Sequence, residues 1–199
     1  LNTNNDSSSA YKIFKHLYKA GGDYSLKDEE DCNIFHRACE KGRLDILDYL
    51  FSQENVPNIN QLSKHGSGLH LAVIGDQEDT VNFLLERGID IELKDNNGNT
   101  ALHLAIQLKM FNAFKMISDH VVKSTDITVE KKKSIFNATN EEGNTILHEL
   151  AYAKSSVLIG YLTKMSTEYK VDESAKNKQG YDYKGVQENI IKLQKEKTS

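Results

Sequence analysis

Residues 100–105 read Thr-Ala-Leu-His-Leu-Ala, and this stretch decides the fold because similar stretches recur along the chain. Its histidine, His103, has counterparts at His36, His70 and His148. Each of the four follows an Asn, Ser or Thr by three residues and comes directly after a Phe or Leu. Successive histidines are 34, 33 and 45 residues apart. A fixed period of about 33 residues is typical of a repeat protein, and the longer third interval indicates one surface insertion.

Each histidine opens a short apolar helix, and a second helix with apolar residues at helical spacing follows it. The second helices carry Ile46, Leu47, Leu50; Val81, Leu84, Leu85; Phe114, Met116, Ile117; and Leu158, Ile159, Leu162. A helix pair that is apolar on one side only has to stack on its neighbours to bury that side. Turns rich in Asn and Gly, such as 95–99 and 140–144, precede the histidines and are suited to hairpin tips.

These features resemble the ankyrin repeat, whose signature is Thr-Pro-Leu-His-x-Ala. The sequence therefore predicts an all-α solenoid of stacked helix pairs joined by β-hairpin turns. Two repeats depart from the pattern: Ser67-Gly68 replaces Thr-Pro, and His65 and Asp31 stand where the turn glycine is expected. The only proline, Pro57, lies in a connecting segment, so these repeats should be less stable locally than an idealised array.

The repeat pattern also divides the chain. We expect an unfolded polar tail over 1–9, a degenerate capping repeat over 10–27, four repeats over 28–176 and a partial capping repeat over 177–199. The insertion falls near 120–134 and includes three consecutive lysines. Terminal repeats of a stacked array are atypical and polar because one of their faces meets water.

Composition excludes several classes of protein. The 199 residues are 38% hydrophobic and 27% charged, with a net charge of −4, which argues against disorder throughout and against a basic nucleic-acid binder. The sequence has no apolar run long enough for a membrane span, and its N-terminus does not have the layout of a signal peptide. Two cysteines cannot form a disulfide framework, so we expect a reducing compartment. Because the sequence begins with Leu1, we expect it to be a piece of a longer chain.

Two motifs that could suggest metal chemistry are incomplete. Cys32, His36 and Cys39 lack a fourth ligand at a matching spacing, which a structural zinc site requires. His148-Glu149 would need a second histidine at 152 for a metalloprotease motif, but that residue is Tyr152. We instead expect the repeat histidines to hydrogen-bond to nearby turn backbone. Since no catalytic set can be assembled, the prediction is a protein that is not an enzyme, with no metal, cofactor or small-molecule substrate.

The acidic run Asp28-Glu29-Glu30-Asp31 has two interpretations. It can be a solvated charge run that is favourable near the N-terminus of the following helix. It can also be a docking patch for a Lys- or Arg-rich segment of a partner protein.

The middle of the chain also closely resembles the IκB family, which includes Cactus and the ankyrin halves of NF-κB precursors. The segments that carry this resemblance are Leu69-His70-Leu71-Ala72-Val73-Ile74, Gln77-Glu78-Asp79, Leu84-Leu85, Gly88, Asp90, Glu92-Leu93-Lys94-Asp95, Gly98-Asn99-Thr100 and Leu102-His103-Leu104-Ala105. Residues 134–140 are similar to the family's stretch entering a fourth repeat, and residues 179–181 resemble the turn of its last repeat.

The resemblance implies a cytoplasmic inhibitor, with shuttling to the nucleus left open, that binds Rel-homology (NF-κB) dimers. It would mask their nuclear-localisation segment and keep them off DNA, without binding nucleic acid or membrane itself. Hairpin tips and first-helix faces would form the contact surface. By motif position the candidate partner-binding residues are Glu29, Glu30, Ile74, Asn96, Asn97, Asn99, Gln107, Glu141, Glu142 and Asn144.

Two alternatives stay open. The family's phosphorylation motif Asp-Ser-Gly-x-x-Ser is absent, since Asp6-Ser7-Ser8-Ser9 lacks the glycine and the spacing. Flanking regions could supply such a motif. Otherwise the chain would be an unregulated short form similar to the ankyrin mimics of insect-associated viruses, which suppress innate immunity. The runner-up function is an ankyrin interaction module for an unrelated partner, such as a pathogen effector.

Overall fold

The computed structural model describes residues 3–154 and 171–198. The chain forms two compact units, Leu1–Ile89 and Asp90–Ser199. No helix among the described residues is both long enough and apolar enough to cross a membrane.

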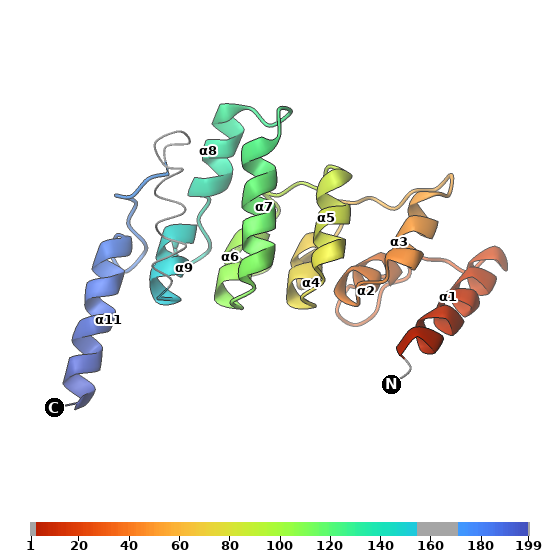
Figure 1. The fold of residues 1–199 in the computed structure, drawn as a ribbon, viewed down its shortest axis with the longest axis horizontal. Coiled ribbons are helices and arrows are strands. Elements are labelled where there is room, and N and C mark those ends of the chain that lie inside the picture. The colour runs from red at the N-terminus through yellow and green to blue at the C-terminus, as the bar shows by residue number, and fades with distance from the viewer. Residues whose placement is uncertain (1–2, 155–170, 199) are drawn as a thin grey trace. The chain divides into compact units, whose positions relative to one another are not determined.

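The first unit consists of helices and one small hairpin. Its elements are α1 (Thr3–Lys19), α2 (Ile34–Glu40), α3 (Leu44–Phe51), β1 (Leu62–Ser63), β2 (Gly66–Ser67), α4 (Gly68–Ile74) and α5 (Glu78–Glu86) (Figure 1). Helices α2 and α3 form one pair and α4 and α5 form a second. The pairs stack, because α2 packs against α4 and α3 packs against α5.

The second unit continues the same organisation. Its described elements are α6 (Ala101–Gln107), α7 (Phe111–Lys123), α8 (Val129–Asn137), α9 (Ile146–Tyr152) and α11 (Tyr183–Thr198) (Figure 1). Helix α6 pairs with α7, and α9 packs against both α6 and α11. The fold is therefore the all-α repeat solenoid that the sequence predicts.

A repeated histidine arrangement starts the first helix of each pair. At α6 the Thr100 hydroxyl accepts from the His103 backbone N–H and lies 2.8 Å from the ring nitrogen Nδ1. The Thr100 backbone N–H also donates to Nδ1, so this nitrogen is an acceptor and the ring proton belongs on Nε2. Nε2 then donates to the Asn144 carbonyl at 3.0 Å, which joins the helix start to the next turn.

The same joint recurs at other repeats. His148 Nε2 lies 2.9 Å from the Tyr181 carbonyl, and His36 Nε2 lies 3.2 Å from the Gln61 carbonyl. The prediction that the repeat histidines bond to turn backbone is confirmed at these positions. Burial of the imidazole lowers the pKa of His103 to about 4 and also lowers the pKa of His36.

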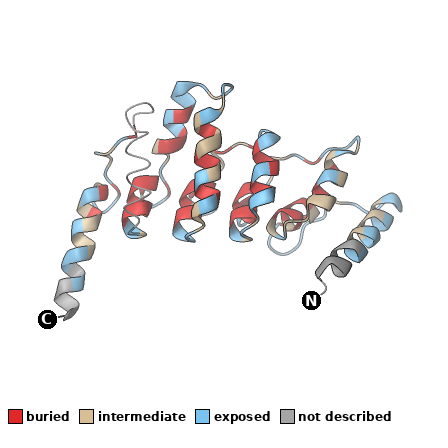
Figure 2. Ribbon diagram, viewed as in Figure 1, coloured by how far each residue is buried: buried red, intermediate tan, exposed pale blue. Residues whose placement is uncertain are grey.

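The core lies where paired and stacked helices face one another (Figure 2). Its largest fully buried side chains are Phe35, Phe114, Phe136, Leu47, Leu50, Leu69, Leu71, Leu84, Leu102, Ile106, Ile117 and Ile146. Eight of the nine predicted apolar positions of the second helices that the structure describes are buried. Met116 is an exception because it is only half-buried on α7. The predicted positions Leu158, Ile159 and Leu162 lie outside the described residues.

At the N-terminus the prediction of an unfolded tail over 1–9 is wrong from Thr3 onward, because α1 begins there. Neither glycine nor proline interrupts the segment before Gly21, so nothing local ends the helix earlier. The helix ends where Gly21 adopts a φ of +89° and the Gly22 N–H bonds to the Leu17 carbonyl.

Most of the predicted insertion near 120–134 is helical. It lengthens α7 to 13 residues and adds α8, which buries Ile135 and Phe136. Lys132 is also buried, and its Nζ donates to the Val122 carbonyl at 2.8 Å. On the outer side of α8, Lys131 forms an ion pair with Glu92.

The hairpin prediction holds only in part. Within the described residues, β1 and β2 are the one strand pair, antiparallel, with Ser63 opposite Gly66. The segments 95–99 and 140–144 are tight turns without strands.

Candidate partner-binding surface

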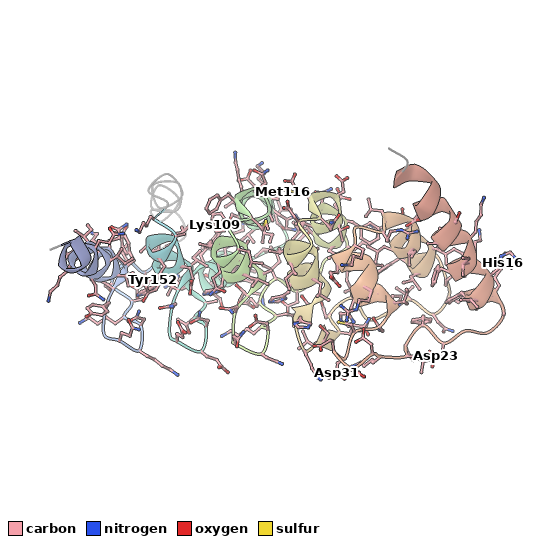
Figure 3. The ribbon with its side chains drawn as sticks, turned by 90° about the horizontal axis from the view of Figure 1, so that it is seen from below. His16, Asp23, Asp31, Lys109, Met116 and Tyr152 are labelled. Atoms are coloured by element: carbon pink, nitrogen blue, oxygen red, sulfur yellow. The ribbon has the colours of Figure 1, made fainter. Side chains whose placement is uncertain are left out.

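In the second unit three similar turns project on the side away from α7, whose Met116 is labelled in Figure 3. The first residue of each turn holds its shape. Asp95 accepts from the backbone N–H groups of Asn97 and Asn99 at 2.9 and 2.8 Å, and Asn140 accepts from Glu142 and Asn144 at 3.0 Å each. The turn 177–181 repeats this arrangement. Such side-chain-to-backbone bonds make the turns rigid supports for the residues at their tips.

Backbone hydrogen bonds join each turn to the next. The Glu141 N–H donates to the Asn97 carbonyl at 3.0 Å, and the Lys178 N–H donates to the Glu142 carbonyl at 3.0 Å. The backbone at positions 97, 141 and 142 is therefore held at a fixed spacing.

A ladder of side-chain amides lies behind the tips. Asn140 Nδ2 donates to Asn99 Oδ1 at 3.0 Å, and Asn177 Nδ2 donates to Asn144 Oδ1 at 3.0 Å. Gln107, at the end of α6, donates to Asn99 Oδ1 at 3.2 Å. The four asparagine side chains are buried, so the bonds between them are protected from exchange with water, whereas Gln107 is exposed.

The ladder ends on a carboxyl group that the sequence analysis did not select. Glu149 on α9 is 6% exposed and accepts from Asn140 and Asn144 at 3.1 Å each. Burial is the main reason that the pKa of Glu149 is raised. In the sequence, Glu149 is distinguished only by its position directly after the repeat histidine. Its carboxyl group contacts the turn residues Asn140 and Asn144.

The turns and α6 enclose a polar pocket of about 240 Å³. Its lining residues are Asn97, Asn99, Gln107, Asn140, Glu141 and Glu142. Five of these six are residues that the sequence analysis selected by motif position. The selected residue Asn144 is 2% exposed and bonded within the ladder, so it supports this surface without projecting from it. Asn96 is exposed at the tip of its turn.

The acidic run lies in the first unit, where internal bonds occupy part of it. Asp28 pairs with Arg37 at 2.7 Å, and this guanidinium holds the pKa of Asp28 below its usual range. Glu30 lies 2.9 Å from His65 Nε2. The Glu29 side chain is exposed and makes no ion pair with the described residues. The run is thus a braced turn whose most accessible carboxylate is Glu29.

Ile74, the remaining candidate in the first unit, is 40% exposed on the last turn of α4. An apolar side chain at this position can contact a partner. A single exposed isoleucine is common on protein surfaces, however, so its exposure alone does not indicate a binding site.

The two cysteines and the histidine of the zinc-like motif are buried in the core. Cys32 and Cys39 are buried free thiols, and burial raises the pKa of both. His36 bonds to the Asn33 cap and to the Gln61 carbonyl. Among the described residues no group of three or more His, Cys, Asp or Glu is placed to hold a metal ion.

Comparison with known proteins agrees with this architecture. A family model for ankyrin repeats, in three copies, matches residues 6–95 and 35–131. The chain is 26% identical over 168 residues to the "Probable 26S proteasome regulatory subunit p28" of Saccharomyces cerevisiae, covering 82% of this chain and 69% of the relative.

Two other relatives are named for NF-κB. The chain is 31% identical over 105 residues to "NF-kappa-B inhibitor alpha" of Mus musculus, covering 53% of this chain and 32% of the relative. It is 26% identical over 173 residues to the "Nuclear factor NF-kappa-B p105 subunit" of Gallus gallus, covering 83% and 16%. The chain thus spans about two thirds of the yeast relative and a third or less of these two. Because the family model matches more than half of it, the chain belongs to the ankyrin-repeat family, whose fold is a protein-interaction module.

Proposed function

We propose that this ankyrin module is an IκB-like inhibitor that binds Rel-homology dimers, masks their nuclear-localisation segment and displaces them from DNA. The observation that carries the proposal is the series of segments between Leu69 and Ala105 that resemble the IκB family. The chain is also similar to NF-kappa-B inhibitor alpha over 105 residues. The proposed site of action is the cytoplasm.

The exposed carboxylates fit a basic partner. Glu29 lies in the braced acidic turn of the first unit, and Glu141 and Glu142 lie on the turn tips of the second. A nuclear-localisation segment is rich in Lys and Arg, and acidic groups held at fixed positions attract such a segment at long range. Complementary charge mainly raises the rate and specificity of association.

Binding of the full chain to a panel of purified Rel-homology dimers, with fluorescent DNA as a competitor, tests the proposal. We expect binding that weakens with salt and releases DNA. Glu29→Lys should weaken binding by roughly two- to fivefold because it reverses one rim charge. The matched control is Glu54→Lys, the same change at an exposed position of the first unit outside the acidic run.

Binding that fails for every dimer would contradict the proposal and leave the module with an unrelated partner. DNA release that Glu29→Lys and Glu54→Lys reduce equally would refute the role of the acidic turn.

A further inference from the structure

The polar pocket of the second unit has the size of a single side chain. Its volume of about 240 Å³ lies below the roughly 300–1,000 Å³ of sites that enclose a whole small molecule. Its lining comes from two consecutive turns and the end of α6, and hydrogen bonds fix all three elements. The pocket therefore exists before any partner arrives.

Three of the four side-chain amides in the pocket wall, those of Asn99, Gln107 and Asn140, already donate within the chain, and the fourth, Asn97, is exposed. Asn140 Nδ2 donates to both Asn99 and Glu149, and Gln107 Nε2 donates to Asn99. Asn99 Nδ2 lies 3.3 Å from an Asp95 carboxylate oxygen. These three amides thus direct N–H groups toward acceptors within the chain.

The charged groups that this arrangement leaves for a ligand are acceptors. Glu141 and Glu142 are exposed carboxylates on the pocket wall, and Glu142 receives one bond from Asn144. An ionised carboxylate only accepts hydrogen bonds and has room for several of them. The lining contains neither lysine nor arginine, so its charge is negative. A ligand that suits these carboxylates is cationic and donates hydrogen bonds.

The next repeat differs at the equivalent position. Gln107 stands four residues after its repeat histidine, and the residue four after His148 is Tyr152. The Tyr152 hydroxyl donates to Gln179 of the following turn at 3.4 Å, so an aromatic side chain spans that interval. Gln107 instead folds back onto Asn99 and lines the pocket.

We propose that this pocket receives an arginine side chain of the bound polypeptide, with its guanidinium donating to the carboxylates of Glu141 and Glu142. A guanidinium is planar, always charged and carries five N–H donors without an acceptor, which matches a lining of this chemistry. Paired carboxylates favour it because its N–H groups form parallel charge-assisted bonds. The inference rests on the proposed function in that it assigns a partner side chain to the same turn surface.

A titration with single-residue probes tests the inference without any Rel protein. The full chain, labelled with ¹⁵N, is titrated with N-acetyl-arginine N-methylamide and, in parallel, with the citrulline analogue, which keeps the shape and loses the charge. We expect saturable shifts of the side-chain amide signals of Asn99, Gln107 and Asn140 with the arginine probe, and an affinity for citrulline that is about tenfold weaker.

The matched variants are Glu141→Gln with Glu142→Gln, against Glu130→Gln on the exposed side of α8. Glutamine keeps an oxygen that can accept from Asn144, so the turn should stay folded, and the amide spectrum reports this directly. The double variant should weaken arginine binding about fivefold to tenfold, while Glu130→Gln leaves it unchanged.

Equal affinity for arginine and citrulline, shifts confined to other parts of the chain, or no response would each overturn the inference. If Rel dimers bind while the arginine probe does not, the pocket assignment is wrong and the proposed function stands. If the probe binds and no Rel dimer does, the proposed function fails and the arginine site stands.

Discussion

His103 Nε2 lies 3.0 Å from the carbonyl oxygen of Asn144, 41 positions further along the chain. The other ring nitrogen of His103 receives the Thr100 hydroxyl at 2.8 Å. One imidazole therefore starts α6 and fixes the next turn, which carries Glu141 and Glu142. The geometry of the candidate surface depends on a side chain that is itself fully buried.

Replacing His103 by alanine should destabilise the protein by about 2–4 kcal/mol, because it removes the buried hydrogen bonds of the imidazole and leaves a small cavity. Urea unfolding followed by circular dichroism measures the change. His16→Ala, at an exposed position of α1, is the control and should change the free energy of unfolding by less than about 0.5 kcal/mol. Similar losses in both variants would show that the joint at His103 contributes nothing specific.

The stabilisation by His103 should depend on pH. Its folded pKa is about 4, below the value near 6.5 of an unfolded chain, so the unfolded state binds the proton more readily. The contribution is complete above pH 6.5 and falls as the pH drops through 6.5 toward 4, by roughly 3 kcal/mol at most.

Comparing the protein with His103→Ala isolates this effect from the other titrating groups. The difference in unfolding free energy between the two should be largest at pH 7.5 and should shrink steadily toward pH 4.5. A difference that stays constant over this range would mean that His103 does not titrate as its burial predicts.

Lys109 offers a stabilising substitution. The residue six positions after each repeat histidine has a positive φ, and it is Gly42 in the first repeat but Asp76, Lys109 and Lys154 in the others. A lysine in this left-handed conformation is strained, whereas glycine is not. Lys109→Gly should raise the free energy of unfolding by about 0.5–1 kcal/mol, as urea unfolding can measure.

Lys109→Ala is the companion variant, because it removes the same side chain and keeps the strain. It should leave stability unchanged or slightly lower. A gain of the same size in both variants would place the effect in the lysine side chain and refute the backbone explanation.

The fold was predictable because its determinants are local and recur. The histidine at a fixed interval, the polar residue three positions before it and the Asn- and Gly-rich turns all belong to short segments that can be compared directly. This pattern predicted that the repeat histidines bond to turn backbone, as His103 does with the Asn144 carbonyl, but it did not specify which carbonyl.

The parts that were missed depend on distant contacts. Glu149 becomes a buried acceptor only because Asn140 and Asn144 turn toward it, which its neighbours in sequence do not reveal. The run of three lysines in the insertion does not reveal that Lys132 is buried while its Nζ reaches the Val122 carbonyl. Likewise, the pocket needs two turns that lie about 45 residues apart, so motif position could select its residues without indicating that they enclose a space.

Gly98 tests whether contact between the turns shapes the surface. A Cβ at Gly98 would lie 2.8 Å from the Glu141 backbone nitrogen, and the residue has a φ of +72°. Gly180 holds the equivalent turn position with a φ of +82°, and a Cβ added there would meet no atom within 4 Å. Gly180→Ala should therefore lower the free energy of unfolding by about 1–2 kcal/mol, through backbone strain alone. Gly98→Ala should lower it by about 2–4 kcal/mol, because the added Cβ also collides with the next turn, and urea unfolding measures both changes. Gly98→Ala should also shift the amide signals of Asn97 and Glu141. Equal costs without those shifts would show that the two turns are not in close contact.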